Sequence, residues 1–120
     1  MAKITAIVND LIFMSRIRSA AETVGTTVEF IQNKNQLDHF LDDCELLLVD
    51  LENDFMEPVI MIEGLKKNPT TASIKTVGYF SHTNTPLKAR ALSAGCNEVL
   101  SRFEFNSNLK EILQTHLSKL

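Results

Sequence analysis

Polar side chains that could do chemistry follow four apolar, strand-like stretches of this sequence. The positions are Asn9 and Asp10 after residues 4–8, Asp50 after 45–49, Ser81 after 76–80, and Ser101 and Arg102 after 98–100. Carboxylates bind hard cations and can act as nucleophiles, while hydroxyl and guanidinium groups donate hydrogen bonds to anions. Each of these residue types could therefore serve a ligand site.

The run from Glu45 to Asp50 indicates where such a site would lie. Residues 46–49 are Leu, Leu, Leu and Val, an unbroken apolar stretch typical of a buried central strand in a parallel sheet. The strand delivers Asp50 to the carboxyl end of the sheet. Because ligands of open α/β sheets bind outside the carboxyl ends of the strands, Asp50 is the first candidate for chemistry.

The remaining elements alternate between strand and helix. Strands are predicted at residues 4–8, 27–31, 45–50, 76–80 and 98–100, and helices at 11–23, 37–44, 58–67, 85–94 and 109–120. This order predicts a flavodoxin-like α/β fold, (βα)5, with a five-stranded parallel sheet and helices on both faces. Right-handed crossovers would bring the polar strand ends together at one site.

Composition sets the class of protein. The chain has 120 residues, 44% of them hydrophobic, which suits a single domain over residues 1–120. Its 12 basic residues against 15 acidic ones give a net charge of -3, so we expect no nucleic-acid partner. Without an apolar segment of membrane-spanning length or a signal peptide, we expect a cytoplasmic protein that does not bind a membrane. Cys44 and Cys96 lack metal-site or redox spacing and are interpreted as small buried residues.

The polar strand ends resemble the receiver domain of two-component response regulators, the CheY-like family, over essentially the full length of the chain. In that family an acid pair follows the first strand, a phosphoacceptor Asp ends the third, a Thr or Ser ends the fourth, and a Lys followed by Pro ends the fifth. The matching stretches here are Ile7-Val8-Asn9-Asp10, Leu48-Val49-Asp50, Tyr79-Phe80-Ser81 and Leu100-Ser101-Arg102-Phe103. The resemblance is to an atypical receiver or pseudo-receiver variant.

The resemblance implies a role for each residue of the site. Asp50 would accept a phosphoryl group, and Asp10, Asp50 and the backbone carbonyl of Glu52 would bind Mg²⁺, which offsets the repulsion between anions. Ser81 would bond a phosphoryl oxygen, and Arg102 would pair with another. A signalling domain of this kind is not expected to be an enzyme.

Several positions depart from the family pattern. Asn9 replaces the first acid, which predicts weaker Mg²⁺ binding because a negative charge is missing. Arg102 replaces the Lys, and its planar guanidinium can clamp a carboxylate but cannot fit the compact space of an ammonium. His82 stands where a small residue normally leaves a path for the phosphoryl group. Phe103 replaces the Pro, and Val99 stands where a switch aromatic is common.

Structural interpretations compete with these roles. Asp10 and Asp50 could simply cap the segments that follow them. Ser81 could be only a turn residue, and Arg102 could form a structural ion pair with either aspartate. His82 could be a solvated loop residue rather than a pH sensor or phosphoryl shuttle.

Two functions therefore remain open. The first is a stand-alone receiver phosphorylated on Asp50 by a histidine kinase or phosphotransfer protein. The second is a pseudo-receiver, an unphosphorylated protein–protein interaction module. In either case the partner surface would comprise the helix at 85–94, the strand at 98–100 and the last helix, including Lys88, Arg90, Val99 and Phe103. Homodimerisation stays open, and a flavin or nucleotide binder is disfavoured because no phosphate-cradling loop follows the first strand.

Overall fold

A single parallel sheet organises the molecule. The computed structural model describes residues 4–37, 41–53, 55–81 and 83–117 of the chain. The strands lie in the order β2-β1-β3-β4-β5, and every neighbouring pair is parallel. Their bounds are β1 (Ile4–Ile7), β2 (Val28–Phe30), β3 (Leu46–Asp50), β4 (Lys75–Phe80) and β5 (Glu98–Ser101). The central position predicted for the strand ending at Asp50 is confirmed.

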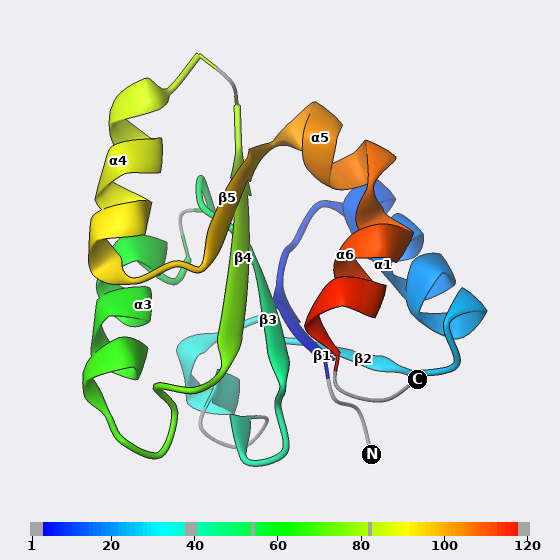
Figure 1. The fold of residues 1–120 in the computed structure, drawn as a ribbon, viewed down its shortest axis with the longest axis horizontal. Helices are drawn as coiled ribbons and strands as arrows, with labels where there is room; N and C mark the ends of the chain where they lie inside the picture. Colours follow the sequence, from blue (N-terminus) through cyan, green and yellow to red (C-terminus); the bar gives the residue numbers. More distant parts are fainter. Residues whose placement is uncertain (1–3, 38–40, 54, 82, 118–120) are drawn as a thin grey trace.

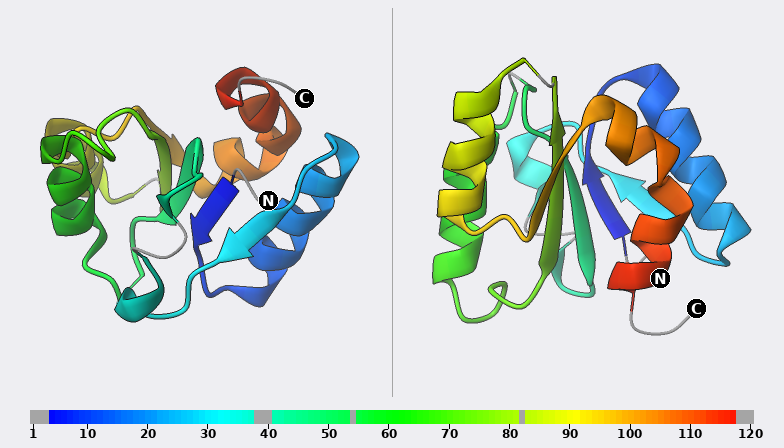
Figure 2. Two further views of the ribbon diagram at one scale, coloured as in Figure 1. Left: turned by 90° about the horizontal axis from the view of Figure 1, so that it is seen from below. Right: turned by 45° about the horizontal axis from the view of Figure 1, so that its top comes forward.

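Helices cover both faces of this sheet, as predicted (Figure 1). Their bounds are α1 (Leu11–Thr23), α3 (Pro58–Lys67), α4 (Thr85–Ala94), α5 (Arg102–Ser107) and α6 (Leu109–His116), with a 3-10 turn at η1 (Lys34–Gln36). Figure 2 shows α3 and α4 together on one side of the sheet, and α1, α5 and α6 on the other. The predicted doubly wound (βα)5 architecture is confirmed, with the final helical region divided in two.

Two cores result, one on each face of the sheet. Leu47 and Val49 of β3 belong to the core beneath α3 and α4, while Leu46 and Leu48 belong to the core beneath α1 and α6. All four side chains have no exposed surface, because a central parallel strand is covered on both faces. By the same alternation, Asp50 lies on the α1 side of the sheet.

Local signals explain where most helices begin and end. Helix α1 runs from Leu11 to Thr23 as predicted, and Gly95 ends α4 in the left-handed conformation, with φ of 107°. The helix predicted at 37–44 includes residues 38–40, which lie outside the described residues. Cys44 and Cys96 are buried free thiols, as predicted.

Helix α5 was not predicted. Its first turn is fixed by a capping box, in which the Ser101 side chain accepts from the Glu104 N–H and the Glu104 side chain accepts from the Ser101 N–H. The chain therefore turns into a helix directly at Arg102 rather than after a loop. None of the helices in the described part of the chain has the length and apolar character needed to cross a membrane.

Candidate functional site

Asp10 joins two structural elements at the carboxyl edge of the sheet. It is the N-cap of α1, and its Oδ1 accepts hydrogen bonds from the backbone N–H groups of Ile12 and Phe13 at 2.9 and 3.2 Å. Its other oxygen, Oδ2, accepts from Arg102 Nη2 at 3.1 Å. The predicted capping role and the predicted ion pair are both confirmed, on different oxygens of one carboxylate.

Asp50 is the most buried charged residue of the site, with 7% of its surface exposed. Its Oδ1 accepts a hydrogen bond from the Glu52 N–H at 2.9 Å, and its Oδ2 lies 4.0 Å from Arg102 Nη1. Burial raises the pKa of this carboxyl, and it outweighs the opposing effects of the Glu52 N–H and the Arg102 charge. The charged form of Asp50 is therefore destabilised by its burial, because little water reaches the carboxylate.

Arg102 places its guanidinium between the two aspartates. Besides its contacts with Asp10 and Asp50, the guanidinium carbon lies 4.6 Å from the ring centre of Phe13 and 5.4 Å from that of Tyr79. Aromatic faces attract a planar cation, so the rings add to the attraction of the carboxylates. Carboxylates and aromatic rings together form a cage around the Arg102 charge.

Tyr79 is the more deeply buried of the two aromatic residues that contact the Arg102 guanidinium. It pairs with Asp50 in the register of β4 with β3, and its ring centre lies 4.9 Å from that of Phe13 and 4.5 Å from that of Phe105. The side chain is fully buried, and within the described part of the chain its hydroxyl has no hydrogen-bond partner. Burial, followed by the nearby Asp50 charge, strongly raises the pKa of this phenol.

Glu52 connects the Asp50 loop to the end of β4. Its side-chain Oε1 accepts a hydrogen bond from the Ser81 N–H at 2.6 Å, while its own N–H donates to Asp50. The Ser81 hydroxyl pairs with the hydroxyl of Thr83 at 3.2 Å. The contacts of Ser81 therefore match those of a turn residue, and Glu52 acts here through its side chain and N–H.

Asn53 fixes the loop that follows Asp50. Its Nδ2 donates to the Asp50 carbonyl at 2.6 Å, and its Oδ1 accepts from the N–H groups of Phe55 and Met56 at 3.2 and 3.0 Å. These bonds make a tight Asx-type turn. The loop after Asp50 is therefore held by hydrogen bonds of the Asn53 side chain, a role that the sequence pattern did not indicate.

The groups present fit a divalent cation poorly as they are arranged. Over the described residues, no three His, Cys, Asp or Glu side chains gather in a way that could hold a metal ion. Asp10 and Asp50 are the two carboxylates predicted to bind the cation, and both contact the guanidinium of Arg102. Asn9, where the resemblance implied weaker binding, is exposed and supplies no charge. The guanidinium of Arg102 thus contacts both carboxylates predicted as ligands, at 3.1 Å from Asp10 and 4.0 Å from Asp50.

The structure brings only some of the predicted site residues into contact. Asp10, Asp50 and Arg102 converge directly, and Ser81 joins them through Glu52. His82 lies outside the described residues. The predicted surface position of Val99 is wrong, because its side chain is 7% exposed and packs in the core beneath α3 and α4.

Two aromatic members of the site were missed. Phe13 lies in the helix predicted at 11–23 and Tyr79 in the strand predicted at 76–80, and neither was among the predicted site residues. Tyr79 joins the site because the register of β4 with β3 pairs it with Asp50, and this register could not be predicted from the sequence.

Comparisons with known proteins place this geometry in a known fold. No protein-family model matches the chain, and no curated protein matches its sequence. Among solved structures, the phosphorylated cyanobacterial phytochrome response regulator RcpA is similar with a TM-score of 0.81 and 17% identity, over 98% of this chain and 96% of that one. The chemotaxis response regulator CheY4 of Vibrio cholerae is similar with a TM-score of 0.80 and 14% identity, over 98% and 99%.

A third similar structure is the Mn²⁺-bound form of response regulator Rcp1. It gives a TM-score of 0.77 and 15% identity, over 98% of this chain and 95% of that one. Each similarity covers nearly all of both chains, so it concerns the whole fold rather than a fragment. The chain therefore has the CheY-like, flavodoxin-like fold of response regulator receiver domains.

Proposed function

We propose that this chain is a receiver-type signalling domain that acts by associating with other proteins, with Asp50 neutralised internally by Arg102. The receiver fold, present over the full length of the chain, supports the signalling role. The choice of the unphosphorylated mode depends on one observation, the position of the Arg102 guanidinium between Asp10 and Asp50.

The reason is electrostatic. A carboxylate attacks a phosphoryl donor only when positive charge offsets the repulsion between the two anions, and the attacking oxygen must be free. Here the positive charge belongs to a side chain that also pairs with the attacking group. Arg102 is anchored by its bond to Asp10, by two aromatic faces and by the capping box that begins α5. A guanidinium held in this way stabilises the site with Asp50 unphosphorylated.

Mg²⁺-assisted phosphorylation of Asp50 is the second candidate. It is favoured by Asp50 Oδ2, which has no hydrogen bond from any described residue and meets Arg102 only at 4.0 Å. The similar structures of phosphorylated RcpA and Mn²⁺-bound Rcp1 agree with this mode. A histidine kinase or phosphotransfer protein would then be the phosphodonor. This mode requires Arg102 to leave the space between the carboxylates.

One experiment separates the two modes. The protein is incubated with Mg²⁺ and a small phosphodonor such as acetyl phosphate, and its intact mass is measured. We expect no phosphoryl adduct on the wild-type chain. An adduct that is absent from Asp50→Asn would instead establish the second candidate. Arg102→Ala is a useful companion, because an adduct that forms only in this variant would identify Arg102 as the block.

A second readout comes from the only tyrosine of the chain. The sequence contains one Tyr and no Trp, so its intrinsic emission reports Tyr79 beneath the Arg102 cage. We expect MgCl₂ to leave this emission unchanged in the wild type. A saturable, millimolar change that disappears in Asp10→Asn would show metal entry and count against the internal neutralisation.

The association surface proposed for this domain is the face formed by α4, β5 and α6. Lys88 and Arg90 of α4 are exposed there. Phe103, at the start of α5, has 79% of its surface exposed, whereas Phe105 is fully buried in the core. Val99 is excluded from this surface by its burial.

A further inference from the structure

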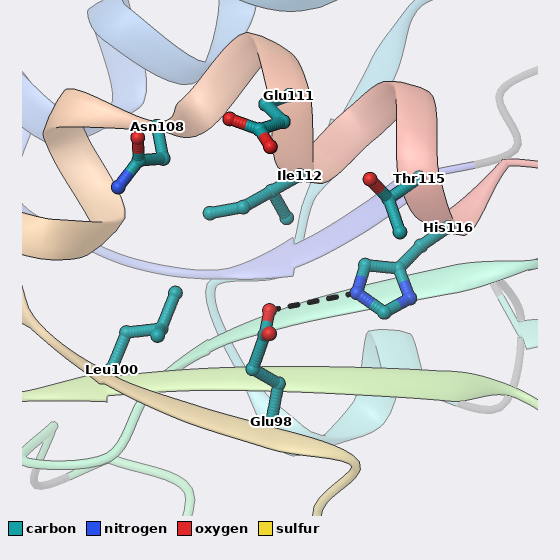
Figure 3. Close-up of a pocket in the computed structure, with 7 residues that line it drawn as sticks. All are labelled: Glu98, Leu100, Asn108, Glu111, Ile112, Thr115 and His116. Atoms are coloured by element: carbon teal, nitrogen blue, oxygen red, sulfur yellow. Dashed lines mark ion pairs between the residues drawn. The ribbon is translucent and has the colours of Figure 1, made fainter.

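A pocket of ≈260 Å³ opens between β5 and α6, away from the Asp50 site. Figure 3 shows side chains from the two elements facing one another across it, with Glu98 and Leu100 on β5, and Glu111, Ile112 and His116 on α6. Strand β5 is the last strand of the sheet and pairs only with β4 in the described sheet. The pocket is therefore open to a partner along the sheet edge.

The walls of this pocket combine apolar and acidic groups. Leu100 and Ile112 supply apolar surface, while the Glu98 and Glu111 carboxylates approach from opposite sides. Lysine and arginine carry an aliphatic stem that packs on apolar groups and a charged end that pairs with carboxylates. The lining thus matches the two parts of a basic side chain.

The two glutamates of this pocket have few cationic neighbours among the described residues. Glu98 lies 3.6 Å from His116 Nε2, a contact that becomes an ion pair only when the imidazole is protonated. For Glu111, the described residues provide no ion-pair partner. Its neighbour Lys110 does not line this pocket, although Lys110 and Glu111 together line an adjacent hollow of α6. The pocket thus presents two carboxylates and, among the described residues, no lysine or arginine side chain.

We propose that this pocket binds an arginine or lysine side chain of a partner protein. The inference rests on the proposed signalling function and gives the chemistry of the partner at its association surface. The aliphatic stem packs between Leu100 and Ile112, and the charged end lies between Glu98 and Glu111. Because Leu100 and Ile112 line the same pocket, we expect the docking basic residue to be followed or preceded by an apolar one.

The test begins with short random peptides displayed on phage. Peptides are selected on the wild-type protein and counter-selected on the double variant Glu98→Gln, Glu111→Gln, which keeps the shape of both side chains and removes their charge. We expect the retained peptides to share a basic residue next to an apolar one. The best peptide is then synthesised, together with a copy in which that basic residue is replaced by norleucine or citrulline.

Binding is measured by fluorescence anisotropy. We expect the neutral peptide to bind the wild type about tenfold more weakly, and the basic peptide to bind the double variant about tenfold more weakly. Glu22→Gln on α1, an exposed glutamate distant from β5 in the fold, is the matched control and should leave affinity unchanged. Circular dichroism melts establish that each variant is folded before its binding is compared.

Three outcomes would overturn the proposal. Selected peptides could lack a shared basic residue, or their affinity could be unchanged in the double variant. Light scattering could also show a wild-type dimer that the double variant loses, which would make a second copy of the chain the occupant. Failure of the proposed function is a separate result, because it is read as a phosphoryl adduct on Asp50 and not at this pocket.

Discussion

Arg102 and Asp10 stand 92 residues apart in the chain, yet Arg102 Nη2 donates to Asp10 Oδ2 at 3.1 Å. Asp10 is the N-cap of α1, and Arg102 is the first residue of α5. The bond therefore ties the beginnings of two helices together above the carboxyl edge of the sheet. Any change that draws Arg102 away from the site would break this contact between α1 and α5.

The first prediction concerns the stability that this contact supplies. Arg102→Ala should lower the free energy of unfolding by about 1 kcal/mol, the sum expected for a partly exposed ion pair and a cation–aromatic contact. Urea denaturation followed by far-UV circular dichroism measures the change. Arg18→Ala is the matched control, because Arg18 lies 5.1 Å from the Phe30 ring centre but forms no ion pair with a described residue. Equal losses in the two variants would contradict a special role for the carboxylates.

The second prediction is a pH dependence of Asp50. Burial raises the pKa of Asp50 in the folded state, so its charged form lowers the free energy of unfolding. This loss of stability is absent at a pH below the pKa of Asp in the unfolded chain, and it is complete at a pH above the pKa of Asp50 in the folded protein. Asp50→Asn should therefore stabilise the protein at neutral pH, by on the order of 1 kcal/mol, and lose this advantage as pH falls towards the ordinary range of Asp. Thermal melts between neutral and acidic pH measure it, with exposed Asp43→Asn as control. A variant less stable than wild type at neutral pH would contradict the sign.

The third prediction concerns the cap that positions Arg102. Ser101→Ala removes the hydroxyl that accepts from the Glu104 N–H, and it should cost about 1 kcal/mol of stability. Ser101→Asp keeps a capping acceptor and should restore most of that loss. Urea denaturation gives the energies, and the emission of Tyr79 reports whether the guanidinium above it has moved. If Ser101→Ala changed neither, the capping box would not position Arg102.

The fourth prediction compares two glycines. A Cβ on Gly78 would lie 2.8 Å from Leu51 Cγ and Cδ1, and Leu51 is buried directly after Asp50. Gly78→Ala should therefore destabilise the protein by about 1–3 kcal/mol through overpacking. Gly64 lies within α3 with open space at the Cβ position, so Gly64→Ala should stabilise by about 0.5–1 kcal/mol. Chemical denaturation of both variants is the measurement, and opposite signs are expected.

Most of the fold could be predicted because its signals are local. The Leu46–Val49 run has no polar residue to turn outward, so a strand at this position must be covered on both faces. Asp10 before an apolar stripe, and Gly95 after one, mark helix ends through backbone hydrogen bonds and left-handed φ. Helix α5 escaped prediction because it is short and lacks a long apolar period. Its signal was the Ser101–Glu104 spacing of a capping box.

The site was predicted in part. Strand ends identified Asp10, Asp50 and Arg102, since parallel crossovers place those ends at one edge. The sequence could not assign Glu52 to a side-chain bond with Ser81, because that bond joins loops 29 residues apart. The aromatic contacts of Phe13 and Tyr79 with Arg102 likewise depend on how α1 packs on the sheet.

The sequence by itself determined the alternation of strands and helices, the central place of the Asp50 strand and the polar character of one sheet edge, because hydrophobic period and capping act over a few residues. Only the tertiary structure decided that the cation between Asp10 and Asp50 is the Arg102 side chain. That choice depends on distances among α1, β3, β4 and α5 after packing, and no spacing along the chain encodes them.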